Sequence, residues 1–278
     1  MRYRPVLLTF AFVATLLACK KENRDDSPTP PTEPQVEKKV LLKDITIPHL
    51  PSPYYHFEYS PDSLCTKANF ASGYTIYDVF HEGNKITEMR NNILVNHDTL
   101  RYFYDNAGKL TFIKFINQSN VNYRQVKFTY DGSQISEIEW DYKSGASDFF
   151  IDRKLTFGFY PDGNVRTIVN HRYPHSGLPE NTTLTEFEGY DNKINVDDFS
   201  LLHDGIHDHL FLLQGFRVQR NNPFKETLTA DGVKLYVVDY TYDYNVDGTP
   251  TAKKGNLLFT SGADAGKRFQ TNSFYTYY

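Results

Sequence analysis

The sequence predicts an all-β protein, an antiparallel meander of repeated hairpins that forms a large curved sheet, with one or two short helices inserted near 196–215. Three observations support this fold class. The 278 residues include 21 Phe and 21 Tyr but only 2 Met and 1 Trp, a composition that favours strands. Apolar and polar residues alternate along several segments. Tyrosines also recur at a nearly constant spacing, each before a polar turn.

The first 18 residues have the order of a bacterial lipoprotein signal peptide. Arg2 and Arg4 precede an apolar run at 6–17, and the small residue Ala18 stands before Cys19. This pattern predicts cleavage before Cys19 and attachment of lipid, including palmitate, to that cysteine. The run is shorter than the roughly 20 apolar residues of a membrane-spanning helix. We therefore expect an outer membrane lipoprotein of the cell envelope, whose membrane partner is bound through the lipid on Cys19.

Residues 19–39 are predicted to form a disordered Pro-rich tether. They contain four prolines and many charged residues, and they cannot bury enough apolar surface to offset the entropy of ordering. The charged residues after Cys19 resemble the export signals of some Bacteroidetes lipoproteins. Both a periplasmic and a cell-surface orientation remain open.

Charge and cysteine content limit the partners. Removal of residues 1–18 takes away Arg2 and Arg4 and changes the net charge from −4 to −6, which disfavours nucleic acid as a partner. With Cys19 lipidated, Cys65 has no intramolecular disulfide partner. It is either a small buried apolar residue, which we favour, or a thiol that forms an intermolecular disulfide or acts as a nucleophile.

Residues 40–278 are predicted to form the β-repeat domain. Phe128 and Tyr130 share one face of a strand, and the pattern recurs over 236–242, so each strand has one dry and one wet face. Turns rich in Asp, Asn and Gly follow a series of tyrosines, and these residues tolerate the positive φ of tight hairpins. The tyrosines, 27, 26, 30 and 30 residues apart, are Tyr77, Tyr104, Tyr130, Tyr160 and Tyr190.

At these turns the chain resembles the YD-repeat proteins, through Tyr104-Asp105 and Tyr130-Asp131. It is most similar to YD-repeat-like lipoproteins of Bacteroidetes, which share the lipobox, a Tyr-Asp-Asn-Lys-x-Asn segment at 190–195 and an Asn-Asn-Pro segment at 221–223. The resemblance implies a curved antiparallel β structure at the cell envelope with no established activity. Pro161 and Val196 depart from the pattern of that family.

The segment 196–215 carries apolar residues at helical spacing and the densest set of metal-ligating side chains, from His203 to His209. His203 and His207 are four residues apart and could bind zinc from one helix face. Gly205 between them weakens that geometry. The alternative, which we favour, is a solvated polar face opposite the apolar stripe.

A second metal candidate lies at 243–248. Asp243, Asn245 and Asp247, followed by Gly248, match the opening of an EF-hand calcium loop. Lys254 occupies the position where a bidentate Glu is needed, so a hairpin turn is the favoured interpretation. The sequence predicts no cofactor.

Glu137, Glu139 and Asp141 lie on one face of a predicted strand, where they suggest either paired catalytic carboxylates or, as we favour, a wet strand face. Two functional classes follow. The preferred one is a non-enzymatic binding or scaffold module that presents its sheet to a glycan or an envelope protein partner, with Trp140 and Tyr142 as ligand-binding candidates if exposed. The alternative is an envelope hydrolase, metal-dependent through the His203–His209 segment. A barrel-type outer-membrane protein is a third option, suggested by the terminal aromatics and disfavoured by the lipobox and tether.

Overall fold

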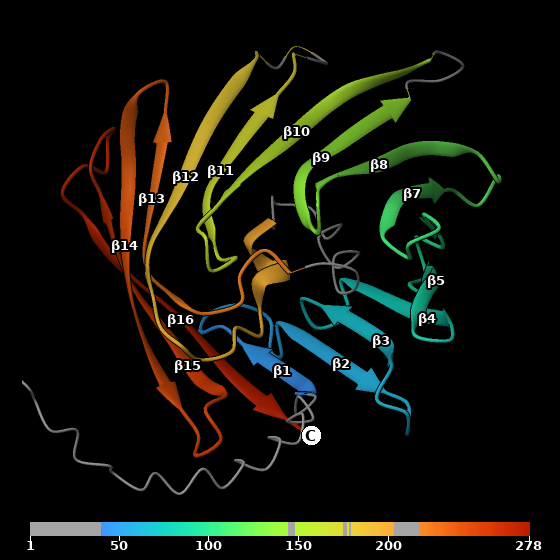
Figure 1. Ribbon diagram of the computed structural model, residues 1–278, viewed down its shortest axis with the longest axis horizontal. Helices are drawn as coiled ribbons and strands as arrows, with labels where there is room; N and C mark the ends of the chain where they lie inside the picture. Colours follow the sequence, from blue (N-terminus) through green and yellow to red (C-terminus); the bar gives the residue numbers. More distant parts are fainter. Residues whose placement is uncertain (1–39, 144–147, 175–176, 178, 203–216) are drawn as a thin grey trace, which may run out of the picture. The chain divides into compact units, whose positions relative to one another are not determined.

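The computed structural model shows a β-meander whose first and last strands pair, so that the sheet closes into a barrel (Figure 1). It describes residues 40–143, 148–174, 177, 179–202 and 217–278. Each strand in these ranges pairs antiparallel with its neighbours in sequence. The strands are β1 (Leu42–Thr46), β2 (Tyr55–Tyr59), β3 (Cys65–Phe70), β4 (Thr75–Glu82), β5 (Lys85–Asn91), β6 (Thr99–Tyr104), β7 (Leu110–Ile116), β8 (Asn122–Asp131), β9 (Gln134–Lys143), β10 (Phe149–Phe159), β11 (Val165–Arg172), β12 (Asn181–Tyr190), β13 (Pro223–Ala230), β14 (Val233–Tyr244), β15 (Pro250–Phe259) and β16 (Arg268–Tyr277).

The expected antiparallel meander is present, but the expectation of an open curved sheet is wrong. Strand β1 pairs with β16, with Ile45 opposite Tyr275 and Thr46 opposite Phe274. An open sheet leaves two edges with unpaired backbone groups, and closure satisfies both. The sixteen strands of the described chain therefore form one continuous ring of hydrogen bonds.

The predicted helical insertion near 196–215 differs from the expectation in the part that the structure describes, residues 196–202, while 203–215 lie outside the described residues. Within 196–215 the structure describes only one short 3-10 helix, η1 (Asp198–Leu202), and no α-helix occurs among the described residues. The described residues contain no helix long and apolar enough to cross a membrane. Phe199 on η1 packs edge-on against Tyr55 and Phe57 of β2, at ring-centroid distances of 5.3 and 5.6 Å. Figure 1 shows η1 inside the ring, so this face of β2 is the inner face.

The connection between β12 and β13 thus enters the barrel, where a tight hairpin was expected after Tyr190. We call its described parts, residues 191–202 and 217–222, the lumen segment. Its two ends are tied together, because the Asp191 amide donates to the Asn222 carbonyl at 3.1 Å and the Asn222 side chain donates to the Asp191 carboxylate at 3.1 Å. Inside the ring, the Tyr275 hydroxyl of β16 donates to Asp197 at 2.6 Å.

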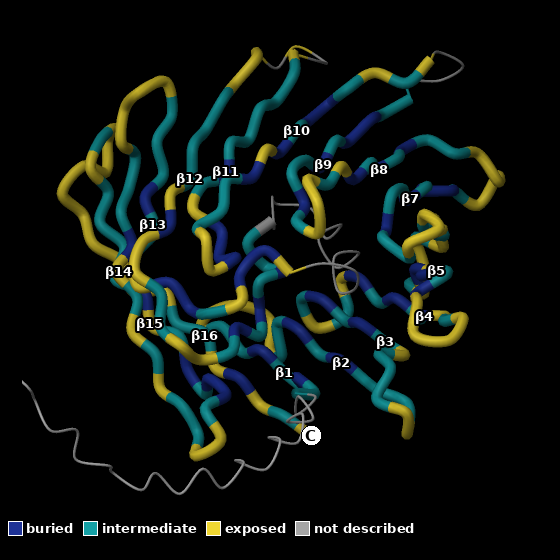
Figure 2. Tube along the Cα trace, in the orientation of Figure 1, coloured by how far each residue is buried: buried dark blue, intermediate teal, exposed yellow. Residues whose placement is uncertain are grey.

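The inner face of the barrel carries the apolar core. Inward residues of neighbouring strands pair directly, as with Val126 and Trp140, or Leu100 and Phe115. These four side chains are almost completely buried. Figure 2 shows the buried positions distributed around the wall of the barrel. The dry faces that the alternation predicts therefore point into the ring, where they pack against one another and against the lumen segment.

The outer face carries charged residues, which pair across neighbouring strands. Lys127 of β8 lies 2.8 Å from Glu139 and 2.7 Å from Asp141 of β9, and Lys154 of β10 continues the row to Glu137 at 3.1 Å. Further pairs of this kind join Lys67 to Glu58, Arg101 to Glu88, Lys225 to Glu188 and Lys254 to Asp243. The outer face therefore combines ion pairs with single exposed aromatic side chains, such as Phe80 and Phe103, each 41% exposed.

A recurring tyrosine contact joins the hairpins at the rim where odd-numbered strands begin. The hydroxyl of a tyrosine near the end of an even-numbered strand donates to the carbonyl of the first or second residue of the preceding odd-numbered strand. The described contacts are Tyr59 to Leu42, Tyr104 to Ile86, Tyr130 to Leu110, Tyr190 to Val165, Tyr242 to Pro223 and Tyr277 to Pro250. We call this edge the tyrosine rim. Of the predicted tyrosine repeat, Tyr104, Tyr130 and Tyr190 make this contact. Tyr160 instead donates to the Phe187 carbonyl of β12, and Tyr77 lies near the start of β4, away from the bend.

Candidate functional site

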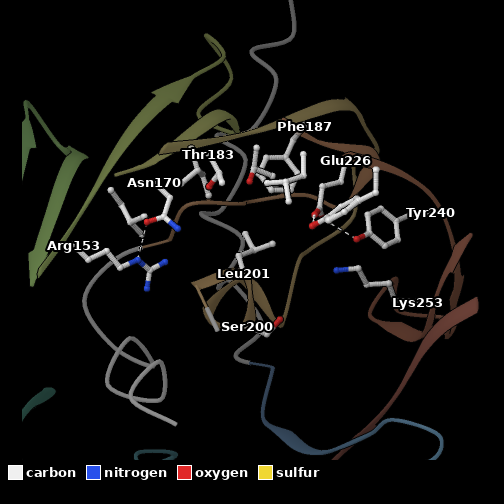
Figure 3. Close-up of a pocket in the computed structure, with 14 residues that line it drawn as sticks. Arg153, Asn170, Thr183, Phe187, Ser200, Leu201, Glu226, Tyr240 and Lys253 are labelled. Atoms are coloured by element: carbon white, nitrogen blue, oxygen red, sulfur yellow. Dashed lines mark hydrogen bonds between the residues drawn. The ribbon is translucent and has the colours of Figure 1, made fainter. Parts of the chain in front are cut away.

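A cavity of about 410 Å³ lies inside the barrel, against the inner walls of β10–β15. Its volume is within the range of about 300–1,000 Å³ that is usual for small-molecule sites. The apolar part of the lining consists of Leu155, Ile168, Phe187, Leu201 and Leu228. The polar part consists of Arg153, Asn170, Thr183, Thr185, Ser200, Glu226, Tyr236, Tyr240 and Lys253 (Figure 3).

Strand pairing explains why these side chains meet. Glu226 of β13 is opposite Phe187 of β12 and Val238 of β14, and Asn170 of β11 is opposite Thr183. Residues opposite each other in a sheet point to the same face. The six neighbouring strands β10–β15 therefore direct a mixed polar lining toward the lumen. Strands β1–β9, in contrast, direct mainly aliphatic and aromatic side chains toward it.

Glu226 is held in place by two phenols. The Tyr236 hydroxyl donates to Oε1 at 3.0 Å and the Tyr240 hydroxyl donates to Oε2 at 2.8 Å. Burial raises the pKa of both tyrosines, and the nearby Glu226 charge raises it further. Both phenols therefore stay protonated as donors at neutral pH, and the carboxylate is fixed as an acceptor on the cavity wall.

Lys253 brings a positive charge to the same wall. Its ammonium lies 4.7 Å from the centre of the Tyr240 ring and 4.0 Å from the Asp197 carboxylate. Its side chain is only 13% exposed. Gly255, two residues along β15, makes room for this arrangement, because a Cβ there would come within 3.0 Å of the Tyr240 ring.

Arg153 occupies the other side of the cavity, as Figure 3 shows. Its Nε donates to the Asn170 side chain at 3.0 Å, and its guanidinium lies 4.8 Å from the Trp140 ring centre. Trp140 is the single tryptophan of the chain and is 2% exposed. A ligand that moves Arg153 would therefore change the surroundings of Trp140.

The sequence-based ligand candidates lie beside this site. Trp140 is buried in the core and is reached from the cavity only through Arg153, so the condition of exposure set for it is not met. Tyr142 is half-buried, with the Arg124 guanidinium 4.7 Å from its ring centre. Glu137, Glu139 and Asp141 do share one face, and that face is the outer one, where lysines neutralise them. The wet-face interpretation fits Glu137, which is 30% exposed, whereas Asp141 is covered and only 2% exposed.

The calcium candidates form a hairpin turn between β14 and β15. The Asn245 side-chain oxygen accepts from the Thr249 amide at 3.0 Å, and Asp247 accepts from the Thr249 hydroxyl at 2.8 Å. Asp243 forms an ion pair with Lys254 on the outer face. Gly248 has a φ of 84°, as such a turn requires. The turn's own donors and Lys254 therefore engage the side-chain oxygens of this loop.

The zinc candidates His203 and His207, and the rest of the His203–His209 segment, lie outside the described residues, as does the lipidation candidate Cys19. Within the described ranges, no group of three or more His, Cys, Asp or Glu side chains is placed to hold a metal ion. Cys65 is described, and burial raises the pKa of its thiol to about 12. A thiol with that pKa stays protonated at neutral pH and is a weak nucleophile.

Sequence reasoning missed the cavity. Its signal is the run of polar residues at inward positions, such as Thr183 and Thr185 before Phe187. Without the closed ring, these positions look like wet strand faces, because alternation alone does not say which face is enclosed.

Comparisons with known proteins support the fold. No protein-family profile matches the chain, and no curated protein matches it. Among solved structures, it is similar to a porin-like protein from Bacteroides vulgatus, with 17% identity, a TM-score of 0.58 and coverage of 86% of this chain and 99% of that one. It is also similar to a porin-like protein from Bacteroides uniformis, with 12% identity, a TM-score of 0.57 and coverage of 81% and 89%.

These similarities correct the resemblance to YD-repeat lipoproteins, which is wrong. The Tyr-Asp turns that suggested it, such as Tyr104-Asp105 and Tyr130-Asp131, are bends at the tyrosine rim of a closed barrel. A tyrosine before a polar turn is useful wherever one hairpin must be joined to the next, so this pattern alone does not identify a family.

Proposed function

We propose that the protein is a non-enzymatic binding module of the cell envelope, a barrel that stands in water and is held at the membrane by lipid on Cys19. The observation that carries this proposal is the charged outer face. A barrel that spans a bilayer needs an outward apolar band about 25 Å tall, and a lysine at the midplane costs about 2–4 kcal/mol. Here Lys127 and Lys154 lie on the outer face with their carboxylate partners.

Strand length supports the same proposal. A membrane-spanning strand needs roughly 9–11 residues. Nine of the sixteen described strands are shorter, among them β1, β2 and β3 with 5, 5 and 6 residues, while the other seven have 10 to 12. The structural relatives are described as porin-like, and at their low identity they carry the fold to this chain and nothing more. The membrane attachment rests on the signal-peptide pattern before Cys19.

Fractionation of cells that express the full chain tests the proposal. The chain has two cysteines, so substitution of Cys65 is the control for substitution of Cys19. We expect the unaltered protein and Cys65→Ala to sediment with membranes, and Cys19→Ala, with residues 1–18 replaced by a signal peptide that is cleaved without lipidation, to be released as a folded, soluble protein. Labelling with a palmitate analogue is expected for the first two and not for the third. If Cys19→Ala remains in membranes after alkaline carbonate washing, the barrel is inserted in the bilayer and the proposal is wrong.

A further inference from the structure

We propose that the cavity between β10–β15 and η1 binds a small hydroxyl-rich anion, a sugar acid, with its carboxylate at Lys253 and its hydroxyls at Glu226. This inference rests on the proposed binding role and names the class of ligand. It is carried by Lys253, whose side chain is only 13% exposed and whose ammonium has one carboxylate at 4.0 Å, because a charged group with few partners is expensive to keep away from water.

The first step of the argument is the state of Lys253. Among the described residues, no hydrogen bond of 3.5 Å or less engages its ammonium, and its nearest carboxylate, Asp197, is 4.0 Å away. Asp197 already accepts a hydrogen bond of 2.6 Å from Tyr275. A largely enclosed ammonium with one distant partner can gain a charge-assisted hydrogen bond from an incoming carboxylate.

The second step is the orientation of Glu226. Its two oxygens accept from Tyr236 and Tyr240, and each carboxylate oxygen can accept a further hydrogen bond. Because both phenols hold the carboxylate in place, a ligand hydroxyl can donate to it without an added cost of ordering the side chain. A fixed carboxylate selects ligands that donate, and a sugar carries several such hydroxyls.

The third step is size and lining. Tyr236 and Tyr240, four residues apart on β14, place the polar wall over about 13 Å. The volume of about 410 Å³ accommodates a ligand of one or two sugar rings. Leu155, Ile168 and Phe187 supply apolar contacts for the C–H faces of a sugar, while Asn170 and the threonines offer donors and acceptors at its edge.

Two probes that differ in one group test the proposal, methyl glucuronide and methyl glucoside. Each is titrated into the full chain, with Trp140 fluorescence as one readout and calorimetry as the other. We expect the glucuronide to bind with a Kd of about 1 mM or tighter, and at least about tenfold more tightly than the glucoside. Failure of both probes to bind, or equal binding of the two, overturns the proposal.

Two lysines on the same strand provide a matched pair of variants. Lys253→Gln is expected to remove the preference for the acid, and Lys254→Gln, whose side chain points outward to Asp243, to leave it unchanged. If Lys253→Gln does not fold, Lys253→Arg is the second variant. It keeps the positive charge and is expected to keep the preference for the acid. Equal effects of Lys253→Gln and Lys254→Gln overturn the site. These titrations do not depend on the anchor at Cys19, so their failure is distinct from a failure of the fractionation.

Discussion

The two halves of the barrel share their hairpin architecture and differ in what they enclose. Strands β1–β9 direct residues such as Leu100, Ile113 and Ile138 inward, each with 0% exposure, and this dry half packs against Phe199 of the lumen segment. Strands β10–β15 form the wet half, with Arg153, Glu226 and Lys253 on the cavity wall. The tyrosine contacts occur in both halves, with Tyr130 in one and Tyr242 in the other. The tyrosine contacts between strands therefore do not depend on which side chains line the lumen. The wet half is where a ligand can be recognised.

The largest expected effect is a loss of stability from a core substitution in the dry half. Phe57 is 1% exposed and packs against Phe199, so Phe57→Ala is expected to lower the free energy of unfolding by about 3–5 kcal/mol. Leu228→Ala in the wet half, where the side chain borders the cavity, is expected to cost about 1–2 kcal/mol. Urea denaturation followed by circular dichroism measures both. Equal losses would show that the two halves are packed alike.

The second effect concerns the lumen segment, where Asp198 of η1 lies close to β1 and β2. The residue keeps part of its surface exposed, but burial of its carboxyl group raises the pKa to about 6, against the lowering effect of the Val218 amide and Arg217. The unfolded pKa is about 3.9, so the folded protein binds more protons between pH 4 and 6. Stability is therefore expected to fall as pH rises through that window.

Asp198→Asn is the variant that isolates this contribution. We expect it to remove the loss between about pH 4 and pH 6, which amounts to about 2 kcal/mol. Urea midpoints at several pH values measure the difference between the two proteins. If both profiles have the same slope across the window, Asp198 does not carry the pH dependence.

A smaller effect tests the frame that both halves share. Tyr130→Phe removes the hydrogen bond to the Leu110 carbonyl and keeps the ring, with an expected loss of about 1 kcal/mol. Tyr242→Phe removes the matching contact to Pro223 in the wet half, and a similar loss is expected. The double variant is expected to show the sum, because the two contacts share no partner. A loss in one half alone would mean that the tyrosine rim does not support the whole ring.

The smallest effect concerns the outer face. Lys67 of β3 and Glu58 of β2 are 38% and 45% exposed, so their pair is screened by solvent, and Lys67→Met is expected to cost only about 0.5 kcal/mol. The pair of Lys127 with Asp141 is of a different kind, because the Asp141 side chain is only 3% exposed. The difference between variant and parent is expected to shrink in about 1 M NaCl. A loss that salt does not change would argue against a water-exposed outer face.

The hairpins were predictable from the sequence because their signals are local. Tyr130 before Asp131-Gly132 indicates a bend, and Gly132 has the positive φ that the prediction requires. Closure of the barrel was not predictable in this way, since Leu42 and Tyr277 are opposite each other but lie at the two ends of the folded chain. The period of two is the same in an open sheet and in a ring.

The site was harder to predict than the fold for a related reason. Lys253 and Lys254 are neighbours with the same chemistry, yet one faces the cavity and the other the solvent. Glu226 likewise follows Lys225, which pairs with Glu188 outside the barrel. Only the register of β13 to β15 assigns these side chains to the two faces, and register depends on strands far apart in the sequence.

The pairing of β1 with β16 limits the order in which the strand pairs of the barrel can form. During synthesis β1 emerges long before its partner, so β1 keeps an unpaired edge until the ten residues of β16 have been made. Contacts that span almost the whole domain form slowly. The pairing of β1 with β16 is therefore expected to form last. Removal of β16 would leave unpaired backbone groups along β1 and β15, and these exposed edges would be available for pairing with other chains.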